Sequence, residues 1–300
     1  MHEVDAVVNH RTETVNGIRL HWVEAGDGPL VVLLHGFPEF WYSWRNQMPA
    51  LAEAGYRVVA PDLRGYNESD KPEGYDAYLD GPLSADVAGL IAACGEERAT
   101  VVGHDWGGVI AWMTAIRHPE VVDKLVILNA PHPNAYLREI RNPAQILRSS
   151  YVMLFQAPIA PEIMLSAANF WGLRWALRSG SQRVGAFTDE DLDRYATAFS
   201  QPGALTGSLA YYRAMGRRII GAARQSGAVS GNGERRRVTA PTLVIWGRND
   251  PVLSQAIADP GDAMPNRKIV FIEDASHFVQ ADAPERVNEL LLEFLAVRPI

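Results

Sequence analysis

The sequence predicts an α/β protein with a mostly parallel, doubly wound sheet and an inserted helical cap. Short apolar, β-branched segments alternate with helical patterns, which is typical of a parallel sheet covered by helices on both faces. These segments are LVVLLH, YRVVA, ATVVGH, KLVILN, PTLVIWG and KIVFIE, which begin at residues 30, 56, 99, 124, 241 and 268. The alternation stops between about residues 131 and 226, where only helical, aromatic-rich patterns occur.

The segment before these strands predicts an antiparallel start to the sheet. Residues 18–24, IRLHWVE, alternate apolar and polar side chains and follow Asn16-Gly17, a dipeptide typical of tight hairpin turns. Because the other strands are joined through helical patterns, we expect them to be parallel.

Three helices are predicted within the insertion. PEIMLSAANFWGLRWALRS at residues 161–179 and GALTGSLAYYRAMGRRI at residues 203–219 have helical periodicity, and Thr188 with Asp191 forms a capping box for a helix between them. The Gly-rich, polar residues 224–237 predict an exposed linker back to the core. The domain boundaries are therefore 1–133 for the first part of the core, 134–225 for the cap and 226–300 for the second part.

Composition and charge argue against several classes of protein. The 300 residues are 47% hydrophobic and carry a net charge of -7, which repels phosphate and anionic lipid headgroups, so we expect neither nucleic acid nor a membrane as a partner. Cys94 is the one cysteine, and the N-terminal residues lack the apolar run of a signal peptide, which favours a cytoplasmic protein. We expect a monomer or homodimer that uses neither metal nor cofactor.

A candidate nucleophile lies in residues 101–112, VVGHDWGGVIAW. Asp105 is at the centre of a small–x–nucleophile–x–small pattern between a predicted strand and a predicted helix, and Gly103 and Gly107 leave room for the strained turn that this position requires. An aspartate before a helix is more often only an N-cap. The partners described next favour a catalytic role.

Those partners follow in the chain order nucleophile, acid, histidine. Asp250 ends PTLVIWGRND and His277 ends KIVFIEDASH, so each follows a predicted strand. Since the carboxyl ends of parallel strands meet at one edge of a sheet, we expect Asp250 and His277 to lie beside Asp105. Separately, each would be an ordinary turn aspartate or a structural histidine.

The segment HGFPEFWYSWR at residues 35–45 predicts an oxyanion hole. It follows a strand and would bring the backbone N–H of Phe37 close to that of Trp106. We expect His35 to have a structural role and Pro38 to follow a cis peptide bond that bends the loop toward the site.

A carboxylate in the nucleophile position restricts the chemistry. It is ionised at neutral pH, with a reference pKa of about 3.9, and can attack carbon without a base. Attack on an acyl carbon would give a labile anhydride, whereas attack on a saturated carbon gives an ester of Asp105. His277, oriented by Asp250, would then activate the water that cleaves this ester. The substrate therefore offers an electrophilic saturated carbon, in an epoxide or a haloalkane.

Tyrosines in the cap could protonate an epoxide oxygen. Leu205, Leu209 and Tyr212 fall at helical spacing, as do Leu147, Tyr151 and Leu154, so Tyr212 and Tyr151 are expected to face the core while Tyr211 points elsewhere. Both could instead be plain amphipathic core residues. The two reserve candidates are Tyr136 and Tyr195.

Aromatic side chains predict an apolar substrate pocket, although such clusters are often plain core. Its expected members are Phe37, Pro38, Trp106, Phe170, Trp171 and Trp175.

Five segments resemble the epoxide hydrolases of the α/β-hydrolase fold: HGFPEFWYSWR, PDLRGYNESDKP, GHDWGG, LNAPHP and SHFVQADAPE. The resemblance covers nearly the whole chain. It implies a small apolar epoxide as substrate, Asp105 as nucleophile, His277 with Asp250 as the base and its partner, and Tyr151 and Tyr212 as acids. Asn67 stands where relatives often have glycine, and Val152 replaces a polar residue common after the first cap tyrosine.

Two alternatives stay open. Haloalkane dehalogenases are similar in fold and in the Asp-Trp pair, but their second halide donor is commonly an Asn or Trp near the HG motif, where this sequence has Phe37. The related fluoroacetate dehalogenases place arginines after the nucleophile, and DWGGVIAW has none. A receptor of this fold that only encloses a ligand is the third hypothesis, against which the complete triad argues.

Overall fold

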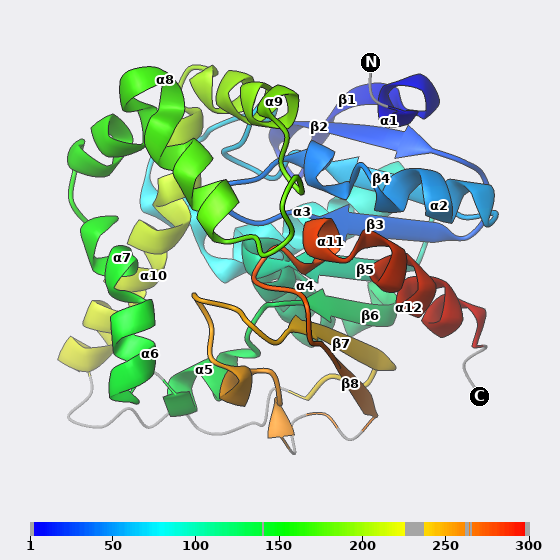
Figure 1. Ribbon diagram of the computed structural model, residues 1–300. Helices are drawn as coiled ribbons and strands as arrows, with labels where there is room; N and C mark the ends of the chain where they lie inside the picture. The colour runs from blue at the N-terminus through cyan, green and yellow to red at the C-terminus, as the bar shows by residue number, and fades with distance from the viewer. Residues whose placement is uncertain (1–2, 140, 226–236, 262–263, 265, 298–300) are drawn as a thin grey trace.

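The computed structural model describes residues 3–297 except 140, 226–236, 262–263 and 265 (Figure 1). An eight-stranded sheet runs through its centre in the order β1-β2-β4-β3-β5-β6-β7-β8. The strands are β1 (Asn9–Val15), β2 (Ile18–Ala25), β3 (Leu30–Leu34), β4 (Arg57–Pro61), β5 (Ala99–His104), β6 (Val122–Leu128), β7 (Thr242–Gly247) and β8 (Arg267–Ile272). The α/β prediction is confirmed, and the six predicted apolar strands are β3 to β8.

The start of the sheet is antiparallel, as predicted. β1 pairs with β2 and β2 with β4 in antiparallel fashion, whereas the pairs from β4 to β8 are parallel. Asn16 and Gly17 connect β1 to β2 with φ values of 48° and 78°. Both residues adopt the left-handed backbone conformation, because a turn of that geometry matches the twist of the two strands that it joins.

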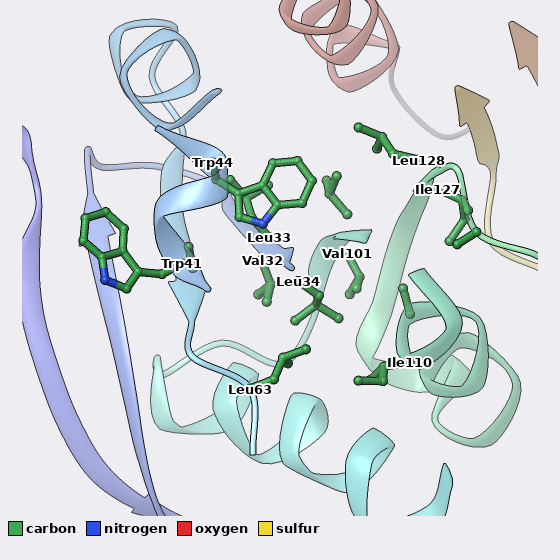
Figure 2. Packing of buried hydrophobic residues seen from close by; sticks show 14 of the residues in the cluster. Val32, Leu33, Leu34, Trp41, Trp44, Leu63, Val101, Ile110, Ile127 and Leu128 are labelled. Carbon is green, nitrogen blue, oxygen red and sulfur yellow. The ribbon is translucent and has the colours of Figure 1, made fainter. Parts of the chain in front are cut away.

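Helices cover both faces of the sheet. The core helices are α1 (Glu3–Val7), α2 (Gln47–Glu53), α3 (Asp80–Ala93), α4 (Asp105–Arg117), α11 (Val279–Asp282) and α12 (Pro284–Ala296). α3 and α4 pack on one face and α2 with α12 on the other, and apolar side chains fill the space on each side of β3 and β5 (Figure 2). Every residue of β3, β5 and β7 is buried, which explains why these strands are continuous apolar runs rather than alternating ones.

The helical insertion lies between β6 and β7 and is called the cap below. It consists of α5 (Pro133–Glu139), α6 (Pro143–Arg148), α7 (Ser150–Leu154), α8 (Ala160–Ser179), α9 (Asp189–Ser200) and α10 (Ala204–Gln225). The predicted capping box is present at α9, where the Thr188 hydroxyl accepts from the Asp191 N–H and the Asp191 carboxylate accepts from the Thr188 N–H. The predicted linker lies mostly outside the described residues.

The prediction of one continuous helix over residues 161–179 is wrong. Ala168, Asn169 and Phe170 have φ values of 50°, 57° and 59°, so α8 consists of two helical pieces joined by a left-handed turn. Gly172 permits the second piece to pack against the first, because a Cβ there would lie 2.5 Å from the Met164 carbonyl oxygen. Residues with good helix propensity lie on both sides of the turn, so a prediction from residue type alone joins the two pieces into one helix.

None of the helices in the described part of the chain is long and apolar enough to cross a membrane. Cys94 is a buried free thiol.

Candidate active site

The turn between β5 and α4 places Asp105 at the first position of the helix with φ at +49°. A non-glycine residue seldom adopts this conformation, and such strain is concentrated at functional sites. Gly107 makes the turn possible, because a Cβ on it would lie 2.1 Å from the Leu34 carbonyl oxygen. The Asp105 side chain keeps 13% of its surface exposed, while the strands beneath it are fully buried.

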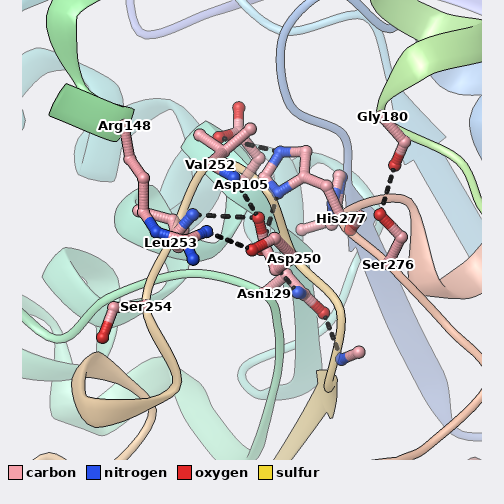
Figure 3. A network of polar contacts seen from close by, with 12 residues as sticks. Asp105, Asn129, Arg148, Gly180, Asp250, Val252, Leu253, Ser254, Ser276 and His277 are labelled. Atoms are coloured by element: carbon pink, nitrogen blue, oxygen red, sulfur yellow. Dashed lines mark hydrogen bonds and ion pairs between the residues drawn. The ribbon is translucent and has the colours of Figure 1, made fainter. Parts of the chain in front are cut away.

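The three predicted triad residues lie together (Figure 3). Asp250 follows β7 and His277 follows β8, so both loops end at the same edge of the sheet as Asp105. His277 Nε2 lies 3.6 Å from Asp105 Oδ2, and His277 Nδ1 lies 2.9 Å from Asp250 Oδ2. The imidazole therefore stands between the two carboxylates, with one nitrogen toward each.

Asp250 is held by hydrogen bonds on both carboxylate oxygens. Its Oδ1 accepts from the backbone N–H groups of Val252 and Leu253 at 2.7 and 2.9 Å, and its Oδ2 accepts from Asn129 Nδ2 at 2.7 Å. Burial would raise the pKa of Asp250, but the charge of His277 and these hydrogen bonds lower it below its ordinary value. Asp250 is therefore ionised at neutral pH and fixed in orientation.

Asn129 is a site residue that the sequence reasoning missed. It follows β6 with φ at 39°, is fully buried, and its Oδ1 accepts the Gly247 N–H at 2.9 Å while its amide group donates to Asp250. A polar residue directly after a parallel strand, in KLVILN, was the available signal.

His277 carries an elevated pKa. Burial would lower it, but the charges of Asp250 and Asp105 and the hydrogen bonds to them raise it well above its ordinary value. Two carboxylates around one buried imidazole thus favour the imidazolium form in the free protein.

The loop after β3 supplies the predicted N–H donor. Phe37 N–H donates to Asp105 Oδ1 at 2.8 Å, and the Phe37–Pro38 peptide bond is cis, as expected. Gly36 lies so close to Asp105 that a Cβ on Gly36 would be 2.4 Å from Asp105 Cβ. Trp106 lies in the first turn of α4, where backbone N–H groups have no partner within the helix.

A second buried acid–histidine pair supports this loop, and the sequence reasoning missed it. Glu39 Oε2 accepts from Gly36 N–H at 2.8 Å and lies 2.7 Å from His104 Nδ1, while His104 Nε2 lies 2.9 Å from the His277 carbonyl oxygen. Burial would raise the pKa of Glu39, but His104 and the Gly36 N–H lower it to about 2. The network connects the Phe37 loop to the backbone of His277.

His35 has the structural role expected of it. Its Nε2 accepts the Leu63 N–H at 3.0 Å, and its Nδ1 lies 2.9 Å from the Gly36 carbonyl oxygen.

The cap places both predicted tyrosines above this edge of the sheet. Tyr212 of α10 is buried, with its ring centroid 5.1 Å from that of Trp106 and 5.5 Å from that of Phe37. Tyr151 of α7 lies beside it, with a centroid distance of 6.0 Å, but Leu147 and Leu154, expected on the same inward face, are 76% and 43% exposed. Burial raises the pKa of each phenol well above its ordinary value, and the charge of Asp105 raises both further. Both phenols are therefore protonated at neutral pH.

Two of the other tyrosines named above, Tyr211 and Tyr195, use their hydroxyl groups in hydrogen bonds away from Asp105. Tyr211 donates to the Arg64 carbonyl oxygen at 2.7 Å, in agreement with the expectation that it points away. The Tyr195 hydroxyl lies 2.7 Å from Ser43 Oγ. Tyr136 is half-buried, and burial raises its pKa.

The pocket prediction needs correction at two positions. Trp171 and Trp175 are 62% and 60% exposed on α8, so they lie at the surface rather than in the interior. The left-handed turn before them changes which face of the helix points inward. Phe170 is half-buried, whereas Phe155, which was not predicted, is buried with its ring centroid 5.0 Å from that of Tyr212.

The cap is tied to the loops of both Asp250 and His277 (Figure 3). Gly180, at the end of α8, accepts from the His277 N–H at 3.2 Å and from Ser276 Oγ at 3.0 Å. From α6, Arg148 donates to the Asp250 carbonyl oxygen at 2.7 Å. No cluster of three His, Cys, Asp or Glu side chains that could hold a metal ion occurs among the described residues.

Comparison with known proteins agrees with this geometry. The family model of the alpha/beta hydrolase fold matches residues 29–284. The AB hydrolase superfamily protein YfhM of Bacillus subtilis is 45% identical over 285 residues, which cover 93% of this chain and 95% of that protein. Human epoxide hydrolase 4 is 41% identical over 289 residues, covering 93% and 76%. The crystal structure of a Bacillus megaterium epoxide hydrolase in complex with an inhibitor has a TM-score of 0.84 at 32% identity, covering 96% of this chain and 100% of that one.

The parallel sheet, the strained turn at Asp105 and the acid–histidine pair on the last two strand ends define a hydrolase of the α/β-hydrolase fold. Epoxide hydrolase A of Mycobacterium tuberculosis is a further relative, 36% identical over 323 aligned residues that cover 95% of this chain and 96% of that protein. The chain belongs to the epoxide hydrolases of this fold family, which confirms the resemblance noted in its sequence.

Proposed function

We propose that this chain adds water to a small apolar epoxide to give a vicinal diol, through a covalent ester on Asp105. The observation that carries the proposal is the position of the Asp105 carboxylate, where a serine hydrolase has a hydroxyl. Its Oδ1 accepts a hydrogen bond from the Phe37 N–H, and its Oδ2 faces His277 Nε2 at 3.6 Å. Because Oδ1 is already occupied, Oδ2 is the oxygen that attacks.

In the first step, Asp105 Oδ2 forms a bond to one epoxide carbon while the bond from that carbon to the ring oxygen breaks. The ring oxygen takes a proton from Tyr151 or Tyr212. Their elevated pKa values keep both phenols protonated until the developing alkoxide, a much stronger base, accepts the proton. The aromatic rings of Phe37, Phe155 and Trp106 supply an apolar surface for the rest of the substrate.

In the second step, the loss of the negative charge on Asp105 lowers the pKa of His277. Esterification removes one of the two negative charges that raise the His277 pKa, and so His277 can release its proton and act as the base. Water attacks Asp105 Cγ, and the oxyanion forms on Oδ1 next to the Phe37 and Trp106 N–H groups. As the bond from Cγ to the alkyl oxygen breaks, His277 gives the proton that it took from water to the leaving alkoxide, which completes the diol. The second water proton passes from the new Asp105 carboxyl group to His277, and the proton that His277 released earlier replaces the one that the tyrosine gave.

A single turnover with enzyme in excess, in water enriched in heavy oxygen, tests the ester. The water oxygen should enter the Asp105 carboxylate, so the peptide that contains Asp105 gains mass while the first diol does not. Label in the diol with none in that peptide would refute the ester intermediate. An Asp105→Ala variant, which cannot form the ester, provides the control for nonspecific exchange.

The two alternatives can be tested with a substrate panel and a second variant. A dehalogenase would release halide from haloalkanes and form no diol from any epoxide. A receptor would bind its ligand equally well with Asp105→Asn and show no turnover in either form. We set both aside because human epoxide hydrolase 4, the Mycobacterium tuberculosis relative and the Bacillus megaterium structure are epoxide hydrolases.

A further inference from the structure

The outer surface of the cap is rich in exposed apolar side chains. Fourteen large apolar side chains are exposed among the described residues, and ten of them lie between residues 137 and 175, each 43% to 76% exposed. These ten, called the cap apolar patch here, are Leu137, Ile146, Leu147, Met153, Leu154, Ile159, Ile163, Met164, Trp171 and Trp175. They come from α5 to α8 and the loop before α8, and α6, α7 and α8 follow one another along one edge of the molecule (Figure 1). Monomeric proteins seldom expose so much apolar surface without an interaction partner.

The cap also has the opposite charge to the rest of the protein. Residues 134–225 contain eleven arginines, six acidic residues and no lysine, a net charge of +5, whereas the whole chain has -7. The other residues therefore carry -12. The net charge of the chain, from which we expected no membrane partner, conceals this separation between the two parts of the fold.

Charge and apolar surface coincide on α8. Trp171 and Trp175 lie one helical turn apart, and Arg174 and Arg178 are interleaved with them. Arg174 pairs with Asp193 at 2.7 Å, and Arg178 pairs with Asp189, so the acids of α9 partly offset these two. Arg138, Arg141 and Arg148 are exposed near the apolar residues of α5 and α6. Tryptophan and arginine together are typical of protein surfaces that lie at the boundary between the headgroups and acyl chains of a lipid bilayer.

We propose that the cap apolar patch docks on the surface of an anionic lipid bilayer. The apolar side chains would enter the boundary between headgroups and acyl chains, and the net positive charge of the cap would be attracted to anionic headgroups. The proposed contact is peripheral, because only side chains of the patch enter the bilayer surface. A second copy of the chain fits less well, because a two-fold symmetric contact through this patch would bring together two segments that each carry an excess of arginine over acidic residues.

Co-sedimentation of the full chain with vesicles tests the proposal. We expect binding to vesicles of phosphatidylglycerol and phosphatidylcholine, and much weaker binding to phosphatidylcholine alone. Raising the salt from about 0.1 M to about 1 M shortens the Debye length from about 10 Å to about 3 Å and should release the protein. The double variant Trp171→Ser with Trp175→Ser should lower the partition coefficient at least tenfold.

The matched control is the double variant Val7→Ser with Val297→Ser, which removes two exposed apolar side chains far from the cap in sequence. It should bind anionic vesicles as the unchanged chain does. Absence of binding to anionic vesicles, or an equal loss in this control, would overturn the proposal. So would a dimer in sedimentation velocity, without vesicle binding, that the two tryptophan changes dissociate, because the patch would then be a contact between copies. Circular dichroism of each variant verifies that it is folded.

Discussion

Replacing Asp105 by Asn should lower the pKa of His277. The substitution keeps the shape of the side chain but removes a negative charge 3.6 Å from His277 Nε2. At an effective dielectric constant of about 20, that charge stabilises the imidazolium by about 4 to 5 kcal/mol. Asp250 remains at 2.9 Å and burial is unchanged, so the Asp105 contribution is the one that is lost. The change reproduces, in a stable protein, the electrostatic effect that ester formation has in the proposed mechanism.

The assay is an NMR titration of the His277 imidazole nitrogens in both proteins, with intact mass verifying that the asparagine has not hydrolysed. A second readout is the pH dependence of stability. A His with a raised folded-state pKa stabilises the fold fully below its ordinary pKa, and this stability is lost as the pH rises through the raised value. The stability advantage of the unchanged chain over the variant should therefore shrink with rising pH. An exposed carboxylate, Asp27, gives the control Asp27→Asn. Titration of His277 at the same pH with and without the Asp105 charge would refute the reasoning.

Three further substitutions test single parts of the site. Tyr212→Phe should lower kcat/KM for an epoxide by about 100-fold. This is near the lower end of what a general acid contributes, because a second phenol remains. The control Tyr211→Phe should have little effect, and equal losses in the two variants would contradict the assignment. His277→Gln should make the ester accumulate, visible as a protein mass increased by that of the substrate, and a variant without this adduct that still turns over would exclude His277 as the base. Asn129→Ala should lower the free energy of unfolding by about 2 to 5 kcal/mol in urea titrations, since it leaves the Gly247 N–H unsatisfied and removes a hydrogen bond to a charged group. A loss below about 0.5 kcal/mol, typical of surface substitutions, would contradict that role.

Strand ends could be located in the sequence because fully buried parallel strands are continuous apolar runs. Asp105, Asp250 and His277 each follow such a run, and the edge they share follows from the parallel arrangement alone. The distance between the Asp105 and His277 side chains depends on the strained turn at Asp105, and Gly103 and Gly107 indicated this turn in the sequence. For these three residues, sequence and structure therefore agree to the level of individual side chains.

Other site residues depend on contacts between segments far apart in the chain. Glu39 and His104 are 65 residues apart and meet only because the Phe37 loop folds over the end of β5. Trp171 and Trp175 were assigned to the pocket because they are aromatic residues of the cap. The left-handed turn at Ala168 to Phe170 redirects the second piece of α8, where both side chains are exposed, and aromatic composition alone does not indicate such a turn.

The hydrogen bonds from Gly180 and Arg148 have a consequence for exchanging caps between related enzymes. The C-terminus of α8 supplies the acceptor for the His277 N–H, and α6 supplies a donor to the Asp250 carbonyl oxygen. A transplanted cap that shapes the cavity well but lacks these two contacts would leave the catalytic loops without their anchors. Chimeras should therefore retain an arginine at position 148 and the backbone turn at residue 180, so that both contacts to the core loops are kept.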